Sequence, residues 1–153
     1  MSGISGNWSE FESSLKKDVE RFHSKKIELV KTIAINGLSG LQIGSPVDTG
    51  RFRSAHDLTV NEPSTFNPDK GLPNEVYTQI AEEALKEAGH KLESLPKGFL
   101  DKLVVFITNN VEYGQFIEDG SYSKDPNAPR KLYAKMAEIL KAKIDEEIAK
   151  FRL

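Results

Sequence analysis

A stripe of apolar residues near the start of the chain most constrains its fold. Its members recur at spacings of three and four: Trp8, Phe11, Leu15, Val19 and Phe22, then, after Lys26, Leu29, Val30 and Ile33. This period predicts an amphipathic helix with one buried face. Ser9 and Glu12 fit a capping box, so the helix is expected to begin near Ser9 and to end at Ser45-Pro46. Its roughly 30 residues would reach on the order of 45 Å. Such a length suggests that part of the helix packs on a neighbouring subunit.

Two further stretches have a helical period. The first carries Val76, Ile80, Ala84, Leu85, Ala88 and Leu92, and Pro96-Lys97-Gly98 is expected to end it. The second carries Leu132, Met136, Leu140, Ile144 and Ile148 at a spacing of four. Either Asp125 or Asn127 is expected to cap this last helix, with a proline in its first turn.

The middle of the chain contains the strand signals. Residues Leu103 to Thr108 form a continuous β-branched and aromatic run, typical of a strand at the centre of a sheet. Residues Asp57 to Glu62 alternate apolar with polar and predict a flanking strand, while Asn61 to Pro73 is expected to be a surface loop. The expected fold class is α+β, with a small antiparallel or mixed sheet packed by long N-terminal and C-terminal amphipathic helices. A single domain, residues 1–153, is expected.

Composition excludes several classes of function. The chain has no cysteine, so disulfide frameworks, zinc-thiolate sites and thiol nucleophiles are excluded. Its 21 basic and 23 acidic residues give a net charge of -2, which does not suit a protein whose main task is to bind phosphates. No stretch approaches the ~20 apolar residues of a membrane span, and the polar start of the chain shows no signal peptide. A soluble protein that is made inside the cell is therefore expected.

The tripeptide Asp48-Thr49-Gly50 matches the core motif of aspartic proteases, in which two such loops bring two carboxylates together to activate water. A single copy could act only in a homodimer. The context favours a turn instead, because Gly44-Ser45-Pro46 precedes the tripeptide and a helix-like Arg51-Phe52-Arg53 follows it. In a turn, Asp48 and Thr49 would bind local backbone amides, and Gly50 would supply a permissive backbone.

Other candidate chemistry is sparse. His23, His56 and His90 are isolated from one another and are expected to be solvated or packing residues rather than metal ligands. Tyr113 and Phe116 are candidates for core anchors. Three charged residues are candidates for an exposed or intersubunit ion pair: Glu118, Asp119 and Arg130. No catalytic residue, cofactor or metal is predicted.

Two segments nevertheless carry a resemblance to a known family. The first reads Ser45-Pro46-Val47-Asp48-Thr49-Gly50-Arg51-Phe52-Arg53. The second carries Asn110, Tyr113, Phe116, Ile117, Glu118 and Gly120, and Ala128-Pro129 follows before the last helix. In this order they resemble the HK97 gp10-like family of tailed-phage proteins. The stretch from Asn61 to Pro96 departs from that pattern as an insertion without an assigned role.

The resemblance implies a small α+β subunit that acts in a bacteriophage or prophage particle. It implies a structural role at the head-tail junction, in the neck or in tail completion, and a structural role for the Asp-Thr-Gly turn. The implied partners are further copies of the chain in a ring, expected to be hexameric, and neighbouring connector, tail-terminator and tail-tube proteins. DNA would pass nearby without specific contacts, and no membrane is involved.

Two other classes of function remain open. One is the homodimeric aspartic protease, in which Asp48→Asn would abolish proteolysis while preserving the fold. The other is an adaptor or regulator from a mobile element, with no place in the particle. The presence or absence of the protein in purified virions separates the adaptor from the structural subunit.

Overall fold

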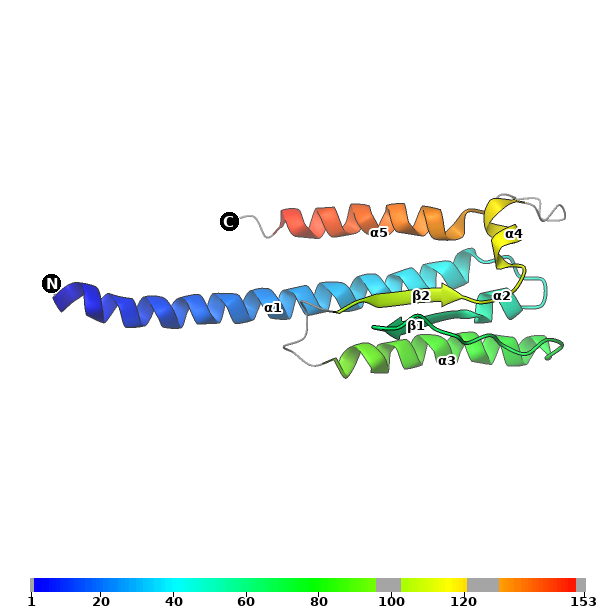
Figure 1. The fold of residues 1–153 in the computed structure, drawn as a ribbon, viewed down its shortest axis with the longest axis horizontal. Coiled ribbons are helices and arrows are strands. Elements are labelled where there is room, and N and C mark those ends of the chain that lie inside the picture. The colour runs from blue at the N-terminus through cyan, green and yellow to red at the C-terminus, as the bar shows by residue number, and fades with distance from the viewer. Residues whose placement is uncertain (1, 96–102, 121–129, 151–153) are drawn as a thin grey trace.

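The computed structural model describes residues 2–95, 103–120 and 130–150. Within them the elements follow the order α1 (Ser2–Gly44), α2 (Arg51–Ser54), β1 (His56–Val60), α3 (Asn74–Glu93), β2 (Val105–Asn109), α4 (Gly114–Asp119) and α5 (Leu132–Ala149). Figure 1 shows α1 running through the molecule between α5 on one side and the sheet with α3 on the other. The predicted α+β class, with a small sheet and long terminal helices, is confirmed.

The two described strands form one antiparallel sheet. His56 lies opposite Asn109 at one end, and Val60 lies opposite Val105 at the other. The prediction that the 103–108 run is a central strand is wrong for the described residues, because β2 has a single neighbour there and begins at Val105. The first strand ends two residues before the predicted Glu62, because Asn61 has φ 69° and turns the chain away.

The core lies where α1, β1 and α3 meet. Its buried residues are Ala34, Leu38, Leu58, Ala88 and Leu92. The helix α3 contributes Ala88 and Leu92 from its predicted stripe, and β1 contributes Leu58 between the helices. The buried residues of α1, Ala34 and Leu38, lie outside the stripe that the sequence predicts to be buried. The predicted loop over Asn61 to Pro73 is confirmed, because no helix or strand occurs between β1 and α3. The Pro96-Lys97-Gly98 break lies outside the described residues.

Three glycines let α5 approach α1 closely. A methyl group at Gly37 would lie 3.0 Å from Leu140 Cδ1, and one at Gly44 would lie 3.0 Å from Leu132 Cδ2. At Gly40 the same group would collide with the end of the Met136 side chain. Glycine lowers helix propensity, but at this spacing it forms the surface on which α5 packs.

The first half of α1 differs most from the sequence prediction. The helix begins at Ser2, so Ser9 lies inside it, and Glu12 accepts a hydrogen bond from Trp8 Nε1 at 2.9 Å instead of completing a cap. The stripe from Trp8 to Phe22 was predicted to be buried, yet its five large side chains are between 46% and 58% exposed. In Figure 1 this half of α1 projects beyond the other labelled elements.

The start of α5 also corrects a prediction. The helix begins at Leu132, directly after Lys131 with φ 48°, so no proline lies in its first turn. Its cap is the carboxylate of Glu118 on α4, which accepts hydrogen bonds from the amides of Tyr133 at 2.9 Å and Ala134 at 3.1 Å. The predicted caps Asp125 and Asn127, and the motif residues Ala128 and Pro129, lie outside the described residues.

Candidate functional site at the Asp-Thr-Gly turn

The Asp-Thr-Gly segment forms the turn between α1 and α2. Gly50 has φ 90° and directly precedes α2, a conformation that a residue with a Cβ rarely adopts. The Thr49 hydroxyl accepts a hydrogen bond from the Arg51 amide at 3.3 Å. Asp48 is exposed. Thr49 and Gly50 therefore have the local roles that a structural turn predicts.

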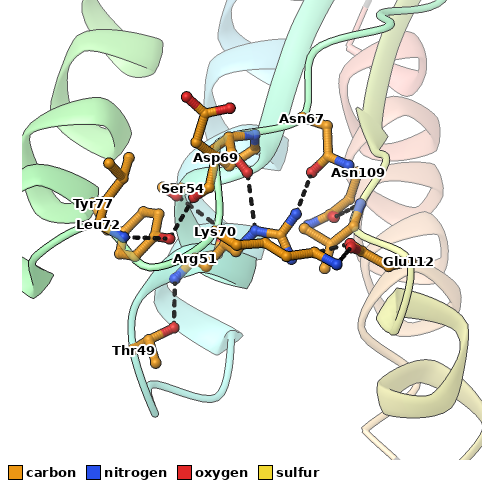
Figure 2. A network of polar contacts seen from close by, with 12 residues as sticks. Thr49, Arg51, Ser54, Asn67, Asp69, Lys70, Leu72, Tyr77, Asn109 and Glu112 are labelled. Carbon is orange, nitrogen blue, oxygen red and sulfur yellow. Dashed lines mark hydrogen bonds and ion pairs between the residues drawn. The ribbon is translucent and has the colours of Figure 1, made fainter.

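Arg51 lies at the centre of a network that joins the turn to distant parts of the chain (Figure 2). The residue is 7% exposed. Its Nε donates to the Pro68 carbonyl at 2.9 Å, and its Nη2 donates to Asn67 Oδ1 at 3.1 Å. Its Nη1 lies 3.0 Å from Glu112 Oε2. One guanidinium thus fixes the 61–73 loop and the segment after β2 against the turn.

Glu112 joins two cations. Lys70 Nζ lies 2.7 Å from its Oε1, on the side opposite Arg51. The hydrogen bond from Lys70, helped by the bond and charge of Arg51, lowers the pKa of Glu112 to about 2. The carboxylate therefore stays ionised at any physiological pH, and the local charge is positive overall for these three side chains.

The 61–73 loop is held by further contacts. Tyr77 is 1% exposed, and its hydroxyl donates to the Asp69 carbonyl and accepts from the Leu72 amide at 3.3 Å. The Asn110 side-chain amide donates to the Ser64 carbonyl at 2.7 Å. The insertion-like stretch that begins at Asn61 is thus bound to both motif segments.

A cavity of about 420 Å³ lies beside this network. Pro46, Asp48 and Gly50 form one wall, and Tyr77 and Tyr113 contribute others. The Arg51 guanidinium lies 5.8 Å from the centre of the Tyr113 ring. The cavity therefore has aromatic walls with cationic groups at its edge, and it is formed by both motif segments together.

A second network lies under the turn, around His56. The buried Ser45 hydroxyl donates to the Leu41 carbonyl at 2.6 Å and lies 2.7 Å from His56 Nε2. The opposite nitrogen, Nδ1, lies 2.8 Å from the Tyr133 hydroxyl and 3.3 Å from Asn109 Nδ2. Because Ser45 uses its proton on Leu41, the ring proton belongs on Nε2, and Nδ1 accepts. Burial lowers the pKa of His56 to about 4. Burial also raises the pKa of the Tyr133 hydroxyl, and the nearby charge of Glu118 raises it further.

Ser45 and His56 are as close as a catalytic nucleophile and its base, but their surroundings do not suit catalysis. Ser45 is 4% exposed and His56 is fully buried, so a substrate carbonyl has no access to either. The partner of Nδ1 is a tyrosine hydroxyl rather than a carboxylate, which would be needed to stabilise a protonated ring. The arrangement instead joins the end of α1 to the sheet and to α5.

The structure brings most of the motif residues together. Tyr113 packs on Phe52 with 6.3 Å between ring centres, and Ile117 is 5% exposed in the cluster that contains Phe52. Gly120 has φ 86° and ends α4. Phe116, predicted as a core anchor, is 51% exposed, so that prediction is wrong. Val47 is also exposed.

Sequence reasoning missed the importance of His56 and the exposure of the α1 stripe. His56 was considered only as an isolated histidine, and its partners lie far from it in sequence. A groove of about 630 Å³ was also missed; it lies between α1, β2 and α5 and is lined by Phe22, Lys26, Leu29, Val30, Ile33, Ala34, Leu103, Val105, Ile107, Leu140, Ile144 and Ile148. Eleven of these twelve side chains are apolar.

Comparison of the chain with protein-family models, curated proteins and solved structures finds no match. Across the described ranges, no group of three or more histidine, cysteine, aspartate or glutamate residues is placed to hold a metal ion. None of the helices in the described part of the chain is both long and apolar enough to cross a membrane.

Proposed function

We propose that the chain is a non-enzymatic structural protein of a tailed bacteriophage or prophage. It acts at the head-tail junction, in the neck or in tail completion, where it joins or stabilises the tail on the head. Its partners are further copies of itself in a ring, six by the resemblance, together with connector, tail-terminator or tail-tube proteins. The proposal rests on the ordered motifs and on one structural observation, the uncovered first half of α1.

The uncovered helix supports an assembly role. Five large apolar side chains between Trp8 and Phe22 are about half exposed along one face. Proteins normally cover contiguous apolar surface of this kind with a partner. A subunit of a larger particle can use such a projecting apolar face for contact with its neighbours.

The Arg51 network supports the motif assignment. The resemblance rests on two segments about 60 residues apart, and the Arg51–Glu112 ion pair joins them directly. Thr49 and Gly50 form the entry to α2, and the proposal assigns no chemistry to the exposed Asp48. A protease would require Asp48-dependent cleavage of peptides near acidic pH, and the Asp48→Asn protein should match the parent chain in that assay.

Deletion of the gene tests the proposed function. We expect filled heads and separate or defective tails in electron micrographs of the deletion strain, because head and tail would each assemble but fail to join. Expression of the intact chain from a plasmid should restore joined particles. Joined, infectious particles from the deletion strain would contradict the proposal.

A further inference from the structure

The apolar positions along α1 are spaced symmetrically about the middle of the stripe. From Trp8 to Ile33, counting Lys26 and Val30, successive positions are separated by three, four, four, three, four, four and three residues. The order reads the same in both directions. An eleven-residue repeat of this kind stays close to the natural pitch of a helix, so two such helices can remain in contact over this length with little supercoiling.

A second α1 running antiparallel would therefore meet this face position for position. The facing pairs are Trp8 with Ile33, Phe11 with Val30, Leu15 with Lys26, and Val19 with Phe22. Lys26 is the one charged member, and its aliphatic stem can cover Leu15 while its ammonium group reaches water. A parallel pair in register would instead set each residue against its own copy.

The charges favour the same orientation. Residues 8–20 hold four acidic and two basic side chains, a net charge of -2, whereas residues 21–31 hold four basic and one acidic, a net charge of +3. Antiparallel pairing sets the acidic segment of each copy against the basic segment of the other. Parallel pairing in register would place the acidic segments of the two copies against each other and the basic segments against each other.

The groove supplies the receiving surface. It begins at Phe22, where the exposed stripe ends, and continues past Ile33 between β2 and α5. The half-exposed stripe side chains offer roughly 100 Å² each. Two stripes, with the groove walls that they would cover, approach the lower end of the ~1,200–2,000 Å² of a stable interface.

We infer that residues 8–22 of α1 dock antiparallel into the groove of a second copy of this chain, while the second copy does the same in return. The contact is isologous, the commonest way in which two identical subunits associate. It does not depend on the head-tail role, and a pair of this kind can act as the unit from which a ring is assembled.

Charge insertion tests the surface. Val19→Glu places two carboxylates near the centre of the paired interface, each against Phe22 of the other copy, and we expect it to raise the dimer dissociation constant by on the order of 100-fold or more. Sedimentation equilibrium measures that constant, and circular dichroism should show unchanged helix content. Ile43→Glu is the matched control, because Ile43 is 77% exposed on the same helix outside the stripe. A monomeric parent chain, or an unchanged dissociation constant for Val19→Glu, would overturn the inference.

Cysteine cross-linking tests the orientation. Because the chain has no cysteine of its own, only the introduced thiols can form a disulfide. A mixture of Leu15→Cys and Lys26→Cys chains should form a disulfide-linked heterodimer under mild oxidation. Each variant alone should form at least tenfold less linked product, because its thiols lie at separated positions of an antiparallel pair. Efficient linkage of Leu15→Cys to itself would indicate a parallel pair and overturn the assignment.

Discussion

Arg51 shows how much of the structure one side chain can hold together. Its guanidinium reaches acceptors on Asn67, Pro68 and Glu112, and all of these lie outside its own helix. The motif indicated that this position mattered within a structural turn. It did not indicate the partners, because the loop and the segment after β2 are brought to it only by the packing of α3 and the sheet.

Arg51→Lys should lower the free energy of unfolding by about 1–3 kcal/mol, because lysine keeps the charge but loses the fork that serves several acceptors. Urea denaturation followed by circular dichroism measures the change. Lys70→Met is the matched control, since Lys70 binds the same carboxylate but its side chain is 73% exposed, and exposed pairs contribute below ~1 kcal/mol. Equal losses in the two variants would contradict the central role of Arg51.

His56 should make stability depend on pH in a defined window. Its pKa falls from 6.5 to about 4 in the fold, so the unfolded chain binds the extra proton between those values. The stability that the neutral, buried His56 ring provides is therefore fully present above pH 6.5. It is lost as the pH falls toward 4, by at most ~1.4 kcal/mol per pH unit. His56→Gln should be less stable at pH 7 but should have a flatter profile across this window. An unchanged slope in His56→Gln would show that another group titrates there.

At the scale of elements, the helical periods predicted α1, α3 and α5 well. The ends of α1 and α5 were predicted less well because their signals are tertiary. Glu118 caps α5 from another helix, and no local sequence rule links a carboxylate to an amide 15 residues away. The glycines of α1 lower its helix propensity, but their side-chain-free surface is what the packing of α5 requires.

Substitution of a glycine in α1 and of a glycine in α3 should therefore have opposite effects on stability. Gly40→Leu should destabilise the fold by about 2 kcal/mol or more, because a large side chain must displace Met136 and separate α5 from α1. Gly89→Ala in α3 should stabilise it by up to about 1 kcal/mol, since a methyl group there meets nothing within 4 Å. Thermal unfolding compares both with the parent chain. A stabilised Gly40→Leu protein would contradict the close packing of α5.

At the scale of the molecule, the α+β class followed from one apolar strand run beside amphipathic helices. The exposure of the α1 stripe did not follow, because a periodic pattern identifies a face but not what covers it. The N-terminal part of α1 extends beyond the ends of α3 and α5 (Figure 1), and Trp8 and Phe11 are 58% and 55% exposed. The suggestion that part of α1 contacts another subunit stays a prediction, like the resemblance and the function that it implies.

Quantitative mass spectrometry of purified, joined particles tests the central claim most directly. The particles would come from a host that carries the gene, separated from free heads and free tails by density. If the chain is a structural subunit of the head-tail junction, its peptides should copurify with joined particles at a fixed small number of copies per particle, six for a single ring. Absence of the chain from joined particles, despite its presence in the lysate, would contradict the account.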